Sequence, residues 1–344
     1  MSLRAVLLIC LVNFSVLSMP VLATDDEIPP APISEEEGLV ELYPANLATV
    51  DFGGEPGVAY DCCDEGACRH GLCGRFLNLL EPSDRCFEDF ISPTSNLLFF
   101  EDPRQLTEAR FVFLNHRVPD DIFGGWELQT IGLQLRARIT DRLSIIATKD
   151  GFIMQQPDSI ADDGWADVAL GLKYSLFRDP ERQRLWSVGF TYELPVGSRR
   201  ALQGNGDGEF HLFLSGGRQI GCHAHWLTGL GIRLPSNHHD RSQMVYWSNH
   251  FDYEVVDNIY GFFEVNWFHW TRSGDNALTN GIAGFDLLNL GSTGVAGLDV
   301  VTLAAGATMK LRCYDELSLG YEFPVSEEED IIRDRFYLTY SLRY

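Results

Sequence analysis

Residues 336–344 read FYLTYSLRY, and this stretch decides the fold because apolar and polar side chains alternate through it. One face of the extended chain carries Phe336, Leu338, Tyr340, Leu342 and Tyr344. The opposite face carries Tyr337, Thr339, Ser341 and Arg343. A period of two is the signature of a β-strand, in which successive side chains point to opposite faces. The alternation therefore predicts a strand that runs to the last residue of the sequence.

The same alternation recurs upstream, clearly in residues 130–139 and 300–312. It predicts twelve strands, separated by turn residues: 108–117, 126–139, 142–150, 165–177, 185–195, 209–220, 223–235, 244–256, 258–270, 299–312, 316–325 and 333–344. Most exceed the usual five or six residues of soluble strands and are long enough to cross a bilayer at a tilt, which takes about 9–11 residues. Strand length thus favours a membrane barrel over a soluble sandwich.

The lengths of the connections give the second criterion. Connections after the odd-numbered strands run roughly 8, 14, 13, 8, 28 and 7 residues, and those after the even-numbered strands roughly 2, 7, 2, 1 and 3. Alternating long loops and short turns, with an even strand count, is typical of outer-membrane barrels. All backbone groups must be paired inside the bilayer, so the barrel must close. We expect an all-β fold, a transmembrane antiparallel up-and-down β-barrel of about twelve strands with an N-terminal periplasmic Cys-rich segment.

The segments before the barrel divide by composition. Residues 1–23 have a basic Arg4, an apolar stretch and a terminal Ala23, which predicts a cleaved signal peptide. Residues 24–61 form an acidic Pro/Gly-rich linker, residues 62–107 a Cys-rich periplasmic segment and lead-in, and residues 108–344 the barrel. The whole sequence has 49 acidic and 26 basic residues and a net charge of -23, which argues against nucleic-acid binding.

Seven cysteines remain after the signal peptide, and export to an oxidising compartment makes them disulfide candidates. They are Cys62, Cys63, Cys68, Cys73, Cys86, Cys222 and Cys313. In the barrel topology all seven map to the periplasmic side. Two interpretations stay open: disulfides tie the Cys-rich segment to the barrel rim as a partial plug, or that segment is a self-contained knot.

Alternation also identifies the charged side chains that face the lumen, eight basic and six acidic: Arg110, Arg136, Arg138, Lys173, Arg233, Lys310, Arg312, Arg343, Asp167, Glu193, Asp252, Glu254, Glu264 and Glu322. Charges of both signs line a polar path in some barrels and form a space-filling salt-bridge network in others. We predict that five near mid-barrel line the pore: Arg136, Lys173, Glu193, Glu264 and Lys310.

The connection at residues 271–298 is Gly-rich but unusually apolar for a loop. Either it folds into the barrel mouth as a constriction, or it packs on neighbouring loops. No metal site, cofactor or catalytic group is expected. The sequences GNGDGE (204–209) and NHHD (237–240) read as turns, and His211, His225 and His250 are expected at different heights. Asn249 and His269 are polar positions on the predicted lipid face, without a serine to complete a hydrolase site.

Two stretches carry a resemblance: CFEDFISPTSNLLFFEDPRQLTEARFVFLNHRVP (86–119) and LRARITDRLSIIATKDGF (135–152). They resemble exported barrel proteins of planctomycete-type bacteria, which have no assigned role. The general layout of 108–344 is similar to transporter-like barrels linked to aromatic-compound degradation. The resemblance implies an outer-membrane barrel and carries no catalytic residues.

The function that we expect is passage of small solutes, apolar or aromatic ones among them, through an outer-membrane channel. The alternatives are a non-conducting structural or envelope-attachment barrel and, behind it, a barrel-embedded lipid hydrolase. The expected partners are outer-membrane lipid, small solutes and the barrel assembly machinery, which would recognise the C-terminal strand.

Overall fold

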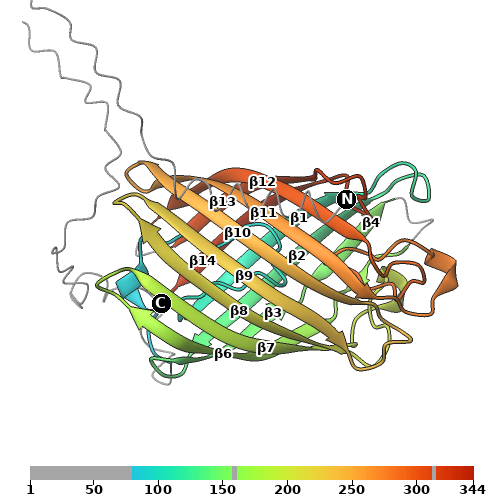
Figure 1. Ribbon diagram of the computed structural model, residues 1–344, viewed down its shortest axis with the longest axis horizontal. Helices are drawn as coiled ribbons and strands as arrows, with labels where there is room; N and C mark the ends of the chain where they lie inside the picture. The colour runs from blue at the N-terminus through green and yellow to red at the C-terminus, as the bar shows by residue number, and fades with distance from the viewer. Residues whose placement is uncertain (1–79, 157–160, 312–314) are drawn as a thin grey trace, which may run out of the picture. The chain divides into compact units, whose positions relative to one another are not determined.

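In the computed structural model, which describes residues 80–156, 161–311 and 315–344, one antiparallel sheet dominates (Figure 1). Its strands are β1 (Glu108–Arg117), β2 (Glu127–Arg138), β3 (Leu143–Lys149), β4 (Phe152–Gln156), β5 (Gly164–Trp165), β6 (Val168–Asp179), β7 (Arg184–Leu194), β8 (Glu209–Ile220), β9 (Ala224–Pro235), β10 (Gln243–Val256), β11 (Ile259–Arg272), β12 (Asp299–Lys310), β13 (Glu316–Pro324) and β14 (Asp334–Arg343). The described helices are short 3-10 turns: η1 (Arg85–Phe87), η2 (Arg199–Ala201) and η3 (Ala277–Thr279). None of these is long and apolar enough to span a membrane.

The sheet closes because β1 pairs with both β14 and β2, and every other spanning strand pairs with its sequence neighbours. The β1–β14 register runs from Glu108 opposite Arg343 to Arg117 opposite Asp334. β3 and β4 follow one another along β2, and β5 leads into β6 beside them, so the fourteen strand segments make twelve crossings. The predicted twelve-stranded antiparallel barrel is confirmed.

The third crossing differs from the continuous strand predicted at 142–150, because it breaks at Asp150 and Gly151 and continues as β4. At the break, the Leu133 amide donates to Asp150 Oδ1 at 2.7 Å in place of a ladder partner. Gly151 has a φ of 125°, and a Cβ there would lie 2.5 Å from the Ile131 carbonyl oxygen. Glycine is therefore required for the wall to bulge at this height.

The two faces of the wall have opposite character, as β7 shows. Trp186, Val188 and Phe190 point outward and are 39%, 38% and 40% exposed. Ser187 and Thr191 point inward and are 0% and 2% exposed. An apolar belt of this extent around a closed barrel is the surface that lipid covers.

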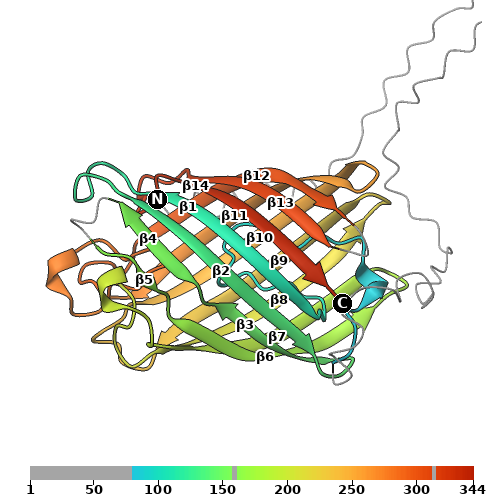
Figure 2. The same ribbon diagram turned by 180° about the vertical axis from the view of Figure 1, so that it is seen from behind.

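The core lies inside the barrel, where two segments of the chain enter from opposite ends (Figure 2). We call residues 81–107 the plug and residues 273–298 the inward loop. The plug enters at the end with the short turns, where the Glu81 amide bonds the Arg138 carbonyl, and returns there to begin β1. Its side chains Phe87, Phe90 and Phe100 pack with Leu185 and Leu227 of the wall.

A second, larger cluster joins the tip of the plug to the inward loop. Leu97 and Phe99 of the plug belong to it together with Phe285, Leu287 and Leu288 of the loop. Burying one large apolar side chain contributes about 1.5–3 kcal/mol of transfer free energy. This contact is therefore a substantial share of the interior packing. The two segments therefore meet within the lumen.

Candidate functional site

The plug is held to the wall by buried ion pairs. Glu101, which is 4% exposed, lies 2.6 Å from the Arg136 guanidinium and 2.7 Å from the Lys173 ammonium. Arg136 also pairs with Glu108 at 2.8 Å. Arg136 and Lys173 thus face the lumen as the alternation indicates, and one carboxylate of the plug pairs with both of them.

The plug is also braced internally. Asp102 and Arg104 form an ion pair at 2.7 Å. The same guanidinium donates to the Phe90 carbonyl at 2.7 Å and to Ser92 Oγ at 3.0 Å, which joins the entering and returning arms. On the wall, Lys310 Nζ donates to the Glu88 carbonyl of the plug and lies 4.5 Å from the centre of the Tyr260 ring. The plug is therefore one folded unit rather than a loose tail.

Glu264 binds the plug near its tip, where its carboxylate accepts from the Thr94 and Ser95 amides at 2.7 and 2.6 Å. The last predicted pore-lining residue, Glu193, lies on the other side of the lumen and pairs with Lys149 at 3.0 Å and Arg241 at 2.7 Å. All five predicted residues face the lumen, and each has a partner inside the protein. Their role along a solute path stays a prediction.

The inward loop is held at the opposite end of the barrel. Asp286 pairs with Arg335, and the Phe285 carbonyl accepts from Arg233 at 3.0 Å. Asn289 donates to Glu209 at 2.9 Å and accepts from the Ser242 amide at 2.9 Å. Phe285, Leu287, Leu288 and Leu290 of the loop are buried in the barrel mouth, whereas Leu278 is 91% exposed. The loop thus enters the mouth, the first position expected from sequence, and also contacts a neighbouring loop, the second.

A carboxylate of the neighbouring loop fixes the backbone of the inward loop. Asp330, between β13 and β14, accepts from the amides of Ala283, Gly284 and Phe285 at 2.8, 3.2 and 2.5 Å. Burial raises the pKa of Asp330 to about 6, against the lowering effect of those three amides. The position of the loop is thus linked to protonation of one aspartate outside the membrane-spanning strands.

Acidification is expected to hold the inward loop more firmly. The raised pKa means that the docked loop favours the protonated carboxyl, so the contribution of Asp330 is complete below its ordinary value of 3.8 and is lost as pH rises through about 6. Chymotryptic cleavage after Phe285, normalised to a reference peptide at each pH, should accelerate between about pH 5 and pH 7.5. Asp330→Asn should remove this step, and Glu329→Gln, at an exposed neighbour, should keep it. A step retained in the Asp330 variant would refute the linkage.

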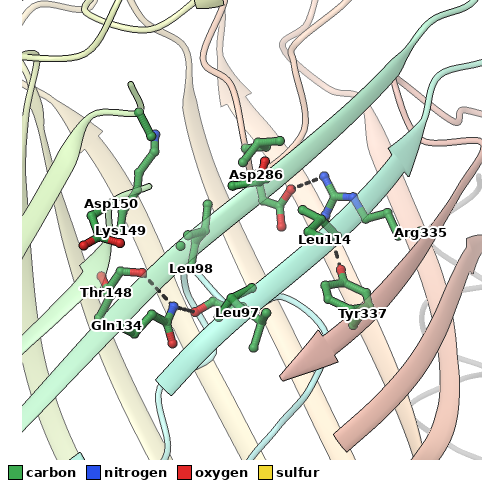
Figure 3. Close-up of a pocket in the computed structure, with 15 residues that line it drawn as sticks. Leu97, Leu98, Leu114, Gln134, Thr148, Lys149, Asp150, Asp286, Arg335 and Tyr337 are labelled. Carbon is green, nitrogen blue, oxygen red and sulfur yellow. Dashed lines mark hydrogen bonds and ion pairs between the residues drawn. The ribbon is translucent and has the colours of Figure 1, made fainter. Parts of the chain in front are cut away.

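A cavity lies where the plug tip, the inward loop and the wall meet (Figure 3). The cavity has a volume of about 40 Å³ and is partly open to solvent. Its apolar lining comes from the plug, β1, the connection between β5 and β6, and the inward loop: Leu97, Leu98, Val112, Leu114, Ala166 and Leu287. It sits beside the break in the third crossing, because Gly132, Thr148 and Asp150 also line it.

Of the four charged side chains that line the cavity, three are in ion pairs, and Asp150 accepts from the Leu133 amide at 2.7 Å. Lys149 pairs with Glu193 at 3.0 Å, and Asp286 pairs with Arg335 (Figure 3). Thr130 Oγ1, by contrast, is buried and has no hydrogen-bond partner among the described residues. A neutral guest with one polar group matches this lining better than an ion does, because burying an unpaired charge is costly.

Two of the three histidines expected at different heights lie together, so that expectation is wrong for them. His225 pairs with Asp252 directly across β9 and β10, and His250 contacts the same aspartate. In a hairpin, residues equally far from the loop face each other. His211 lies apart and bonds Tyr246. No group of three or more His, Cys, Asp or Glu in the described ranges is arranged to hold a metal ion.

The two polar positions on the lipid face are bonded locally. Asn249 accepts from the Trp226 indole at 3.1 Å. His269 lies 3.0 Å from Asp299, which also accepts from Trp267 at 2.8 Å. These local hydrogen bonds satisfy the polar groups on an otherwise apolar surface, and tryptophan indole N–H groups are among the donors.

Most of the disulfide candidates, Cys62, Cys63, Cys68, Cys73 and Cys313, lie outside the described residues. Cys86 lies half-buried in η1 of the plug, and Cys222 is exposed in the turn between β8 and β9. Tethering of the Cys-rich segment to the rim therefore stays a prediction.

The comparisons with known proteins agree with the fold. No protein-family model matches the chain, and no curated protein matches its sequence. Among solved structures, the COG4313 outer membrane channel from Pseudomonas putida F1 is similar, with a TM-score of 0.50 and 12% identity over 74% of this chain and 100% of that one. The NanC porin (TM-score 0.43, 6% identity, 69% of this chain, 100% of that one) and the CymD monoaromatic hydrocarbon channel (0.37, 8%, 69% and 88%) also match. The first likeness shows that this chain has the fold of an outer-membrane β-barrel.

Proposed function

We propose that the protein is an outer-membrane channel for small solutes, closed at rest by the plug and the inward loop. The observation that carries the proposal is that separate segments, not wall side chains alone, fill the lumen. Both segments are held by side-chain bonds that can be exchanged for water without breaking the β-ladder. A twelve-stranded barrel lies between filled eight-stranded barrels and open porins, so removing either segment would leave space for a solute.

The preferred solutes are neutral and apolar or aromatic. The cavity between the two closing segments supports this class, because leucine and valine side chains line it and three of its four charged side chains are in ion pairs. The second candidate is a non-conducting structural barrel, and the density of buried ion pairs around the plug favours it. The location and assembly follow as proposals: a signal peptide at 1–23, a periplasmic N-terminal segment, and recognition of the C-terminal strand by the assembly machinery.

Single-channel recording in planar bilayers tests the proposal on the full chain. The wild-type protein should give discrete steps, and Ser242→Cys with Asn289→Cys, whose parent side chains are 3.1 Å apart, should lock the loop under oxidation and silence it. Reductant should restore the steps, and the current of neither single variant should respond to oxidant or reductant. Benzyl alcohol should reduce the current, whereas benzoate should not. Silence of the wild type at every voltage would favour the structural barrel.

A further inference from the structure

A chain of four titratable side chains leads from the wall of the barrel to the plug. His225 Nδ1 lies 2.7 Å from Asp252 Oδ1, and His250 Nε2 lies 3.2 Å from Asp252 Oδ2. His250 Nδ1 lies 2.6 Å from Glu264 Oε1, and Glu264 binds the plug backbone. His225 is 2% and Asp252 3% exposed, and His250 and Glu264 are fully buried. The chain therefore lies in the interior, away from bulk water.

Both ring nitrogens of His250 face carboxylate oxygens. A neutral imidazole has one N–H donor and one lone pair, so it can donate to only one of the two carboxylates. The imidazolium donates to both and brings a positive charge between two negative ones. The geometry is therefore satisfied only when His250 carries its second proton.

Glu264 transmits this state to the plug. Its carboxylate accepts from the Thr94 amide, the Ser95 amide and Ser95 Oγ, all in the segment that approaches the tip. Without the imidazolium, Asp252 and Glu264 become neighbouring buried carboxylates with no cation between them, an arrangement that draws in water or moves one group away. Glu264 would then leave the position from which it holds the plug.

We propose that His250 is a positioning residue for the plug: as an imidazolium shared by Asp252 and Glu264, it fixes Glu264 beneath the Thr94 and Ser95 amides. The inference rests on the part of the proposed function that treats the plug as a removable closure. It adds that the stability of the docked plug depends on one proton inside the barrel. Loss of that proton loosens the plug, so the docked state weakens as pH rises.

The groups that surround His250 favour its protonated form, which agrees with weaker docking of the plug at higher pH. β9 contributes His225, β10 contributes Asp252, and β11 contributes Glu264 and the Phe262 ring, whose centre lies 5.5 Å from that of His250. From the plug come the neutral backbone and hydroxyl groups of Thr94 and Ser95. Asn266, beside Glu264, links Ser95 Oγ at 2.8 Å to Glu322 at 3.1 Å. Carboxylates outnumber cations around the ring, which favours its charged form.

Hydrogen exchange of the full chain in detergent micelles tests the proposal, with protection factors read from peptides that cover residues 92–98. In the wild type, protection of this segment should fall roughly tenfold once alkaline pH removes the second proton of His250, a change equivalent to about 1.4 kcal/mol. His250→Gln should show the low value throughout and no pH step. Asp252→Asn, which keeps the shape of the side chain, should move the step to lower pH because the imidazolium loses one of its two carboxylates.

The matched control is His211→Gln. His211 is also buried and also contacts the plug, through Tyr246 and the Phe99 ring, but no carboxylate oxygen is among its hydrogen-bond partners. It should keep the wild-type pH step. A wild-type profile in both His250→Gln and Asp252→Asn would overturn the proposal. If those variants loosen the plug and yet no variant conducts, the positioning role holds and the channel function fails, so the two failures are distinguishable.

Discussion

Replacing Glu101 with alanine is expected to cost about 3–5 kcal/mol in the free energy of unfolding, the range found when one partner of a buried ion pair is removed. The carboxylate is the shared partner of Arg136 and Lys173, at 2.6 and 2.7 Å, and all three side chains are almost fully buried. Without it, Lys173 is left without its carboxylate and Arg136 keeps only Glu108. The plug should leave that position, and single-channel conductance should rise together with the loss of stability.

Urea unfolding in micelles, followed by tryptophan fluorescence, measures the first effect and bilayer recording the second. Glu81→Ala is the control, since Glu81 belongs to the same segment but its side chain is exposed. It should change stability by no more than about 0.5 kcal/mol. Glu101→Gln, which keeps the shape and one acceptor, should fall between the two. A Glu101→Ala protein as stable as the control would contradict the assignment of Glu101 as the main anchor.

The fold could be predicted from sequence because its signal is local. Each crossing shows period-two alternation within about ten residues, and the first strand was placed at 108–117, where β1 is found. Lipid selects apolar side chains on the outer face and the lumen selects polar ones on the inner face. The alternation can therefore be read without knowing which residues contact one another. The break at Asp150 and Gly151 escaped prediction because it depends on how closely Gly151 approaches Ile131 on another strand.

The site could be predicted only in part, because its contacts join residues far apart in sequence. Alternation placed Arg136 and Lys173 on the lumen face but gave no indication that Glu101 would neutralise them. One signal was available: Phe87, Phe90, Phe99 and Phe100 are too apolar for a lead-in exposed to water. Read together with Glu101, they indicate a segment that is buried and paired. The meeting of His225 and His250 required the hairpin register, which a long loop leaves undetermined from sequence.

The two closures use the same physical device. Each combines an apolar patch, which is not specific to one position, with buried charges that are satisfied in one position only. A buried ion pair is weak evidence for stability, but it strongly disfavours positions in which one partner is left alone. Such pairs suit a segment that must dock in a single place and yet remain separable from the wall. Removing one partner of such a pair should therefore destabilise the protein more than removing both partners.

Arg335 at the inward loop tests that distinction. Its guanidinium pairs with Asp286, donates to His116 Nδ1 at 2.6 Å and lies 4.5 Å from the centre of the Phe285 ring, and the side chain is fully buried. Arg335→Ala should destabilise the protein by about 3–5 kcal/mol because Asp286 is left without its cation. It should also raise conductance, because Asp286 is the loop's buried ionic contact with β14.

Two companions make the measurement decisive. Arg333→Ala, two residues earlier, removes an exposed pair with Asp120 at 3.4 Å and should cost about 0–1 kcal/mol. The double variant Asp286→Ala with Arg335→Ala should be more stable than Arg335→Ala alone, since Asp286 is no longer left without its cation. Glu322, which lies 4.0 Å from Arg335, loses its cation in both proteins, so its effect cancels in the comparison. The unfolding free energies of the wild type, Asp286→Ala, Arg335→Ala and the double variant form a double-mutant cycle. Additive effects in that cycle would mean that the pair does not hold the loop, whereas a coupling of about 0.5–3 kcal/mol is the value expected for residues in direct contact.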